Sequence, residues 1–420
     1  MNEVKKKQVL QLASRMGELM MAYGAESFRV EDTISRICKA SGVDNVNVFV
    51  VPTGIFISIE PDHEDGEIMT SVRRLYSRTT NLCKMSRLNQ ISREFTSTDM
   101  TVETALSEIN RIAEEPDRPL WLMLLGAGIA SAFFAVIYST NIMTFICAFL
   151  IGVFAEYLYI ILSKIDMNFF IKGFTCCAAA ATLSVMCQIV GLTPGYGAVI
   201  VGVIMLFTPG AALTNAIRDL LQGGMLSGVS AMAETMLIAV SLAGGVGIVL
   251  KIRSLTAPPV SVTNIEIPLW ATVILAAAAV AGYSILFYVP WKAMIASCFV
   301  GAFGWAACQA MSSMGQSSVV ATLLGSFIVA AGALVCSRTL HLPNTVFIIP
   351  SIITLVPGAL TYFTMRDFLA GNLNSAISLG VDTILTAGAI ALGLFGFGAI
   401  VQVISQIRKR AASRINKLAG

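Results

Sequence analysis

Apolar and polar positions follow one pattern up to about residue 118 and a different pattern after it. Residues 8–23 place apolar side chains at i, i+3, i+4 and i+7, which predicts an amphipathic helix. The period then changes to β-rich runs on either side of Pro52-Thr53-Gly54, which predicts a hairpin over 46–59. The other predicted elements are a helix over 26–40, a turn over 61–66, a third strand over 67–75 and helical segments over 84–114. We therefore expect residues 1–118 to form a small α+β soluble domain.

Long apolar runs replace these short elements from residue 119 onward. Most of them have the length of about 20 residues that a helix needs to cross a bilayer. The fourth run of each group is short and stops at a Pro-Gly pair. This pattern predicts a polytopic α-helical membrane protein with about ten transmembrane helices. The runs lie near 120–138, 142–163, 169–190, 195–207 and 228–250, and again near 268–288, 293–312, 316–337, 344–356 and 376–402.

The apolar region contains the same unit twice. Residues 206–235 and 354–383 align without a gap at an offset of 148, and earlier positions align at 149. Five crossings is an odd number, so two sequential copies must lie in opposite orientations, and we expect two five-helix inverted repeats. If the short fourth runs do not cross, each copy has four crossings and the repeat is parallel. The predicted segments are 119–250 and 268–404 for the repeats, 251–267 for a loop and 405–420 for a basic tail.

The distribution of charge agrees with this division. Residues 1–118 hold 33 of the 53 Asp, Glu, Lys and Arg side chains. If the N-terminal domain is cytoplasmic, most lysines and arginines of the remaining chain fall on its side, and only Lys251, Arg253 and Arg366 fall on the other. Cytoplasmic segments of membrane proteins carry an excess of Lys and Arg. We therefore expect both termini in the cytoplasm and the protein in the inner or plasma membrane.

Composition argues against several classes of function. Hydrophobic residues make up 56% of the chain and charged residues 13%, against roughly 25% charged in soluble domains. The nine cysteines form no CxxC pair and there are two histidines, so we expect no metal site and no cofactor. No basic patch with interleaved aromatic residues indicates a nucleic acid partner. No Ser-His-Asp or Cys-His arrangement supports an enzyme.

The Pro-Gly breaks are the first candidates for binding chemistry. Inverted repeats with paired discontinuous helices indicate a secondary transporter, with its substrate near the membrane midplane between the repeats. A helix N-terminus at the break attracts a carboxylate, and unwound carbonyl groups attract an ammonium group. A structural kink without ligand contact is the alternative. The predicted substrate-binding residues are Pro209, Gly210, Ala211 and Asn215 in the first copy and Pro357, Gly358 and Ala359 in the second.

An Arg-Asp pair follows each break, Arg218-Asp219 in the first copy and Arg366-Asp367 in the second. One interpretation is a gate on each side of the membrane, in which the ion pair forms and breaks as access alternates. The other is an interfacial ion pair that ends a half-helix. The sequence leaves both interpretations open.

Three carboxylic acids lie within or near the ends of apolar runs. An ionisable group in lipid is costly, so it faces the protein interior, a partner or water. Glu234 and Asp382 occupy the same position in the two copies, and Glu156 aligns with Trp305. Because a buried carboxyl group can exchange protons near neutral pH, we expect Glu234, Asp382 and Glu156 to couple transport to protons. The alternative for Glu234 and Asp382 is that they neutralise nearby arginines or lie at the membrane interface.

Three segments of the sequence carry a resemblance to a known family. GAESFRVEDTISRI at 24–37, VFVVPTGIFISI at 48–59 and PGAALTNAIRDLLQG at 209–223, together with ten apolar runs in two copies, resemble the threonine/serine exporter family. In some relatives the two units, here 1 to about 250 and about 268–404, are separate polypeptides associated with succinate export. The resemblance implies a fused exporter of small hydroxy amino acids driven by the proton gradient.

The sequence leaves alternatives to this function open. One alternative is export of succinate or a related dicarboxylate, which should need several cationic groups at the site. Only Arg218 and Arg366 lie near the breaks, and this favours a zwitterion as the substrate. A membrane channel and a hydrolase tethered to a permease are further alternatives. The expected partners are a small-molecule substrate and membrane lipid, and a homo-oligomer remains open.

Overall fold

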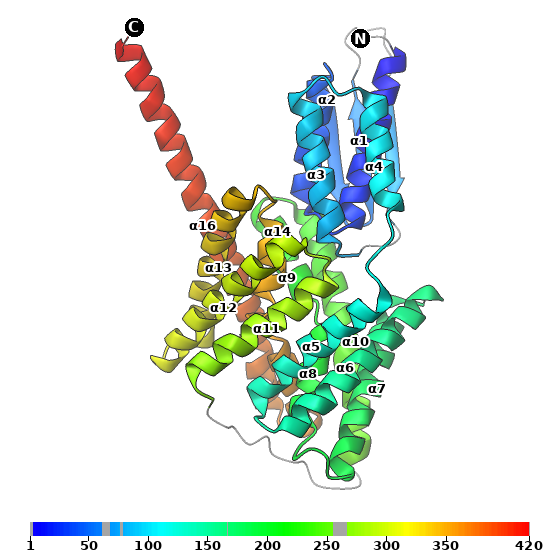
Figure 1. Cartoon of the computed structure of the whole chain (residues 1–420), viewed down its shortest axis with the longest axis vertical. Coiled ribbons are helices and arrows are strands. Elements are labelled where there is room, and N and C mark those ends of the chain that lie inside the picture. The colour runs from blue at the N-terminus through cyan, green and yellow to red at the C-terminus, as the bar shows by residue number, and fades with distance from the viewer. Residues whose placement is uncertain (1–2, 61–67, 76–78, 166, 255–266, 420) are drawn as a thin grey trace.

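The computed structural model describes residues 3–60, 68–75, 79–165, 167–254 and 267–419. The predicted turn over 61–66 and most of the predicted loop over 251–267 lie outside these residues. Figure 1 shows a group of short helices and strands at one end of the molecule and a larger bundle of helices beneath it.

The N-terminal group, which we call the N-terminal unit, has the mixed α and β elements that the sequence predicts. Its three strands pair antiparallel in the order β1-β2-β3, with Val50 opposite Ile55 across the hairpin. Leu12, Ile34 and Ile57 are fully buried in its core. Its elements are α1 (Glu3–Ala22), α2 (Ser27–Ala40), β1 (Val46–Val51), β2 (Gly54–Ile59), β3 (Met69–Arg74), α3 (Leu82–Ser97) and α4 (Val102–Glu114).

The remaining helices form two units with the same order of elements. The helices of the second unit begin 149 residues after their counterparts for the first three and 148 residues after for the last three. The first unit comprises α5 (Leu120–Tyr138), α6 (Ile142–Lys164), α7 (Phe169–Ile189), α8 (Gly197–Phe207), α9 (Gly210–Leu221) and α10 (Met225–Ser254). The second comprises α11 (Leu269–Leu286), α12 (Trp291–Ser313), α13 (Ser318–Leu340), α14 (Thr345–Ile352), α15 (Gly358–Leu369) and α16 (Leu373–Ala419).

Eight helices in the described part of the chain are long and apolar enough to cross a membrane. The prediction of a polytopic helical membrane protein is therefore confirmed. The count of about ten is not confirmed, because α8 has 11 residues and α14 has 8. At 1.5 Å per residue neither spans the hydrocarbon core of about 30 Å. The polar Arg-Asp segments, which were not predicted as spans, form the helices α9 and α15.

The two helical units contact each other through matching residues. Phe134 on α5 and Tyr283 on α11, 149 residues apart, pack edge to face with ring centroids 5.9 Å apart. When equivalent residues of two copies touch each other, they lie near the two-fold axis that relates the copies. Arg118, just before α5, donates a hydrogen bond to the carbonyl of Ile285 near the end of α11, at 2.9 Å. The start of α5 therefore lies beside the end of α11, so these two helices run in opposite directions (Figure 1).

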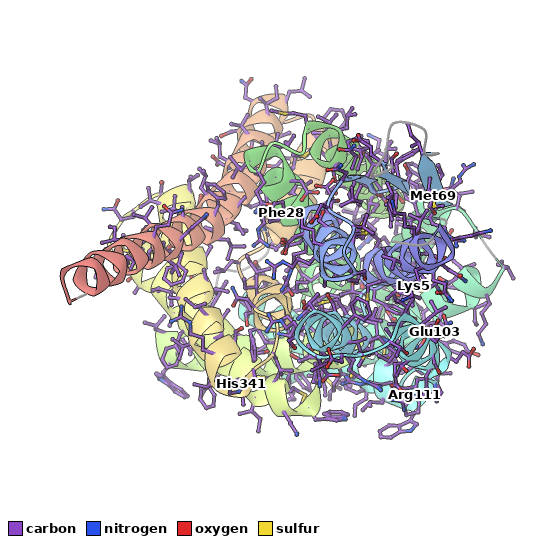
Figure 2. The ribbon with its side chains drawn as sticks, turned by 90° about the horizontal axis from the view of Figure 1, so that it is seen from above. Lys5, Phe28, Met69, Glu103, Arg111 and His341 are labelled. Carbon is purple, nitrogen blue, oxygen red and sulfur yellow. The ribbon has the colours of Figure 1, made fainter. Side chains whose placement is uncertain are left out.

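The N-terminal unit and the end of α16 lie at the same end of the molecule (Figure 1). Seen from that end, the N-terminal unit covers one side of the helical region and α16 projects away from it (Figure 2). The helical region therefore has one face that the N-terminal unit partly covers and an opposite face that it does not reach.

Adjacent glycines on α10 test how closely α7 and α10 pack. A Cβ atom on Gly245 would overlap the backbone oxygen of Phe174, whereas one on Gly244 would lie 3.5 Å from the Phe174 ring. Alanine is better than glycine in a helix by about 1 kcal/mol, so Gly244→Ala should leave the melting temperature unchanged or raise it. Gly245→Ala should lower it, since overpacking costs about 1–3 kcal/mol. The measurement is thermal unfolding in detergent, and equal melting temperatures would contradict this packing.

Candidate functional site

The two Pro-Gly breaks pack against each other at the centre of the helical region. Helix α9 begins at Gly210 directly after Pro209, and α15 begins at Gly358 directly after Pro357. A Cβ atom on Gly210 would overlap Val356, and one on Gly358 would overlap Met205 and lie 3.1 Å from the Thr208 hydroxyl. Thr208 and Val356 are counterparts at the offset of 148, so each break fits against the residue before the other proline. Only glycine leaves room for this contact.

A large cavity, which we call the membrane cavity, lies beside the first break. Its volume is about 650 Å³, and Pro209, Glu156 and Phe207 are among the residues that line it. The rings of Tyr159 and Phe207 stand 5.5 Å apart in its wall. The N-terminal unit contributes Thr79 to the same lining. The cavity thus extends from the N-terminal unit to the break, with a carboxylic acid along its length.

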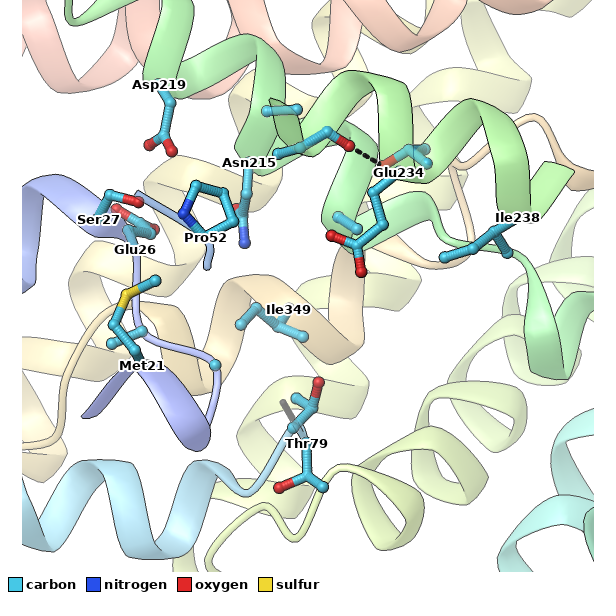
Figure 3. Close-up of a pocket in the computed structure, with 17 residues that line it drawn as sticks. Met21, Glu26, Ser27, Pro52, Thr79, Asn215, Asp219, Glu234, Ile238 and Ile349 are labelled. Atoms are coloured by element: carbon cyan, nitrogen blue, oxygen red, sulfur yellow. Dashed lines mark hydrogen bonds between the residues drawn. The ribbon is translucent and has the colours of Figure 1, made fainter. Parts of the chain in front are cut away.

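A second cavity, which we call the junction cavity, lies between the N-terminal unit and helices α9 and α10. It has a volume of about 220 Å³ and shares Thr79, Thr80 and Ile238 with the membrane cavity. Figure 3 shows Glu234, Asn215 and Asp219 reaching it from α10 and α9. Among the described residues that line it, three are carboxylic acids (Glu26, Asp219 and Glu234) and none is lysine or arginine. The lining therefore favours a positively charged group.

Helix α2 joins the N-terminal unit to the end of α9 through a buried polar network. Arg218 forms an ion pair with Glu26, with side-chain exposures of 10% and 8%. The Ser227 hydroxyl donates to the Asp219 carboxylate at 2.7 Å and lies 2.7 Å from the Ser27 hydroxyl. The hydroxyls of Ser27 and Ser227 and the Asp219 carboxylate thus form one connected cluster. We call the Glu26–Arg218 pair with this chain of hydroxyls the latch.

The same segment also reaches the second helical unit. The Arg29 guanidinium donates to the Thr345 hydroxyl at the start of α14, at 2.9 Å. Burial lowers the pKa of Arg29 below its ordinary value, and the nearby Glu26 carboxylate opposes that shift. Burial likewise raises the pKa of Glu31, against the hydrogen bond from the Val50 amide. Residues 26–31 therefore dock the N-terminal unit onto both helical units.

The structure gathers several predicted site residues and separates others. Asn215, Asp219 and Glu234 line the junction cavity, and Pro209 and Glu156 line the membrane cavity. Asp382 is half-buried on α16, and the Ala211 side chain lies outside the described residues. Of the second-copy residues, Ala359 packs in an apolar cluster, and Arg366 forms an ion pair with Asp367 at 2.9 Å.

The predicted pairing of Arg218 with Asp219 is corrected by the structure. Arg218 pairs with Glu26, which is 192 residues away in the chain, and Asp219 accepts a hydrogen bond from Ser227 instead. Sequence reasoning offered no role for Glu26 or Ser27, although both lie in the distinctive segment GAESFRVEDTISRI. The segment itself was the signal in the sequence that pointed to these residues. Glu26 lies directly before a helix, and a charged residue at such a position needs a partner if it is buried.

Two family descriptions match most of the chain. "Putative threonine/serine exporter" matches residues 11–253, and "Threonine/Serine exporter, ThrE" matches residues 272–400. The chain belongs to the threonine/serine exporter family. The resemblance seen in the sequence is therefore confirmed, and the family is one of transporters. No solved structure matches the chain.

Curated relatives within the exporter family carry two different names. A "Probable threonine/serine exporter" of Mycobacterium tuberculosis is 22% identical over 98% of this chain and 79% of its own length. A "Probable succinate transporter subunit YjjP" of Escherichia coli is 24% identical over 59% of this chain and 95% of its own length. The corresponding protein of Klebsiella aerogenes is 25% identical over 57% of this chain and 91% of its own length. The substrate names thus differ among relatives of this exporter-family chain.

The latch can be tested with arginines at matching positions. Arg218→Met removes one partner of a buried ion pair, which costs about 3–5 kcal/mol, and should raise amide hydrogen exchange in residues 23–31. Arg366→Met is the matched control, because Arg366 is 41% exposed beside Asp367 and an exposed pair contributes about 0–1 kcal/mol. Adding Glu26→Gln to Arg218→Met should restore part of the protection. Equal exchange in both arginine variants would contradict the latch.

Proposed function

We propose that this exporter-family protein is a secondary transporter that exports small hydroxy amino acids, threonine and serine, driven by the proton gradient. The observation that carries the proposal is the pair of adjoining cavities that leads from the N-terminal unit to the break at Pro209, with a lining rich in carboxylic acids. Broken helices beside a cavity are typical of substrate sites in secondary transporters. The family match supports the transporter class.

The charge of the lining favours a zwitterion over a dicarboxylate. The junction cavity attracts an ammonium group through Glu26, Asp219 and Glu234, and its described lining has no lysine or arginine to bind a second carboxylate. Succinate would place two negative charges near these acids. Each like-charge contact at 4 Å costs roughly 4 kcal/mol at an effective dielectric constant of 20. Succinate export is the second candidate, and the name of the Escherichia coli relative supports it.

The proposed architecture is a pair of inverted repeats with five crossings each. Each repeat would have one broken crossing made of two short helices, α8 with α9 in the first and α14 with α15 in the second. Together with the eight long helices, these two broken crossings would give ten. The contact between Phe134 and Tyr283 and the opposite directions of α5 and α11 support this arrangement. An excess of Lys and Arg on the face with the N-terminal unit supports termini in the cytoplasm of a cell-membrane protein. A homo-oligomer stays a prediction.

The latch would act as the cytoplasmic gate, and Arg366 with Asp367 would act as the gate on the opposite side. Glu26 belongs both to the latch and to the lining of the junction cavity. An ammonium group that enters the cavity therefore competes with Arg218 for the same carboxylate. Substrate entry and release of the latch would be coupled through Glu26.

Flux in proteoliposomes tests the substrate. We expect labelled threonine and serine to move when a pH gradient is imposed and to stop when the gradient is collapsed, with little movement of succinate. Loss of gradient dependence with continued flux would indicate a channel. Flux of succinate alone would keep the architecture and replace the substrate.

Substitution of the three acids tests proton coupling. Glu156→Gln, Glu234→Gln and Asp382→Asn should each lower proton-driven flux by about a hundredfold or more, since proton-transfer groups typically contribute about 10²–10⁴-fold, while exchange of labelled for unlabelled threonine without a gradient persists. Glu103→Gln, on the exposed face of α4, is the control. Full proton-driven flux in any one variant would remove that acid from the coupling mechanism.

A further inference from the structure

The two helical units are related by sequence, yet a surface that lines the membrane cavity in the first unit is packed among side chains in the second. Tyr159 and Phe207 line the membrane cavity. Their counterparts at the repeat offsets, Cys308 and Leu355, are 8% and 5% exposed in a packed cluster. A Cβ atom on Gly325 would lie 3.2 Å both from the Cys308 Cβ and from the Leu355 side chain, so α13 fits tightly against both residues. The surface that is open in the first unit is closed in the second.

The closed surface of the second unit carries more hydroxyl and amide groups than the open one. Five positions that are apolar, aromatic or glycine in the membrane cavity become polar or thiol-bearing in the second unit. Buried polar side chains in a membrane protein commonly serve helix–helix hydrogen bonds, whereas the Thr354 hydroxyl donates locally to the Ser351 carbonyl at 3.0 Å. The five substitutions are Tyr159 to Cys308, Ile160 to Gln309, Gly173 to Thr322, Leu206 to Thr354 and Ile238 to Thr386.

Two polar atoms on this closed surface have no such partner. The Trp305 indole nitrogen and the Thr386 hydroxyl are buried without a hydrogen bond to any residue that the structure describes. Trp305 is the counterpart of Glu156 and Thr386 that of Ile238, and both of these line the membrane cavity. An unsatisfied buried polar atom costs about 1–3 kcal/mol. Their position indicates a second arrangement of the helices in which water or substrate reaches them.

We infer that α12, α13, α16 and the segment between α14 and α15 form an exit cavity that opens on the face opposite to the N-terminal unit, lined by Trp305, Gln309, Thr322, Thr354, Thr386 and Asp382. The inference rests on the proposed function, because it assigns this cavity to the same zwitterionic hydroxy amino acid. Asp382 is the counterpart of Glu234, whereas Glu156 is replaced by Trp305 and Glu26 has no counterpart. The exit cavity therefore offers fewer carboxylates to the ammonium group and holds it less tightly, as release requires.

Thiol accessibility from the two faces of the membrane tests the exit cavity. Single cysteines are placed in the full-length chain whose other cysteines are replaced, and a membrane-impermeant thiol reagent is applied to either face of oriented vesicles. Thr386→Cys is compared with its counterpart Ile238→Cys. Val329→Cys is the control, because Val329 is 0% exposed in the same cluster and its counterpart Ala180 is also buried. The native Cys308 alone provides a second probe that needs no substitution at the site.

We expect Thr386→Cys and Cys308 to react from the face opposite to the N-terminal unit, and Ile238→Cys to react from the other face. If the open conformer is populated at about 0.1–10%, each thiol should react at about that fraction of the rate of a fully exposed thiol. Added threonine or serine should slow the reaction. Val329→Cys should not react. The inference of an exit cavity is contradicted by one result. In that result neither Thr386→Cys nor Cys308 reacts from the opposite face, although Ile238→Cys reacts from its own face and threonine flux persists. The expected labelling without threonine or serine flux would keep the cavity and reject the substrate.

Discussion

Satisfaction of backbone hydrogen bonds inside the membrane is the constraint on which the rest of this structure depends. Irregular backbone is not tolerated facing lipid, so a broken helix must be covered by protein or line a cavity. Here the amide of Gly210 donates to the Thr208 carbonyl and that of Gly358 to the Val356 carbonyl, each at 2.8 Å. Each break is then covered by the residues that precede the other. The duplication of the unit supplies the second break that the first one needs.

Burial of charge is the second constraint, and it ties the N-terminal unit to the helical region. Arg218 lies at the end of a half-helix that starts at the central break, and it is 8% exposed. A buried guanidinium needs a buried partner, and that partner, Glu26, comes from the N-terminal unit. Because Glu26 also lines the junction cavity, the N-terminal unit cannot move without changing both the charge balance of the latch and the wall of the cavity.

The sequence predicted elements well and long-range contacts poorly. Periodicity gave the hairpin at β1 and β2 and the long membrane helices, because these depend on local patterns of burial. The helices α9 and α15 were passed over as polar segments, since each has only 12 residues and carries an Arg-Asp pair near its end. Repeat alignment identified Glu234 and Pro209 as site candidates, and Glu156 was identified as an acid within an apolar run; all three line cavities. The Glu26–Arg218 contact joins residues 192 apart, and no periodicity or spacing encodes such a pair.

The single N-terminal unit makes the two ends of the duplicated core different. Both copies keep an Arg-Asp pair after the break, but one N-terminal unit can serve only one of them. Arg218 therefore pairs with Glu26 in a buried site, whereas Arg366 pairs with its neighbour Asp367 in a more exposed one. The two ends of an otherwise matched scaffold thus differ in the free energy needed to separate their charges. Further divergence along the cavity walls, such as Glu156 against Trp305, adds to this difference. Under the proposed mechanism, the repeat would supply two similar states, and these differences would set the affinity on each face, while the proton gradient would set the direction of net transport.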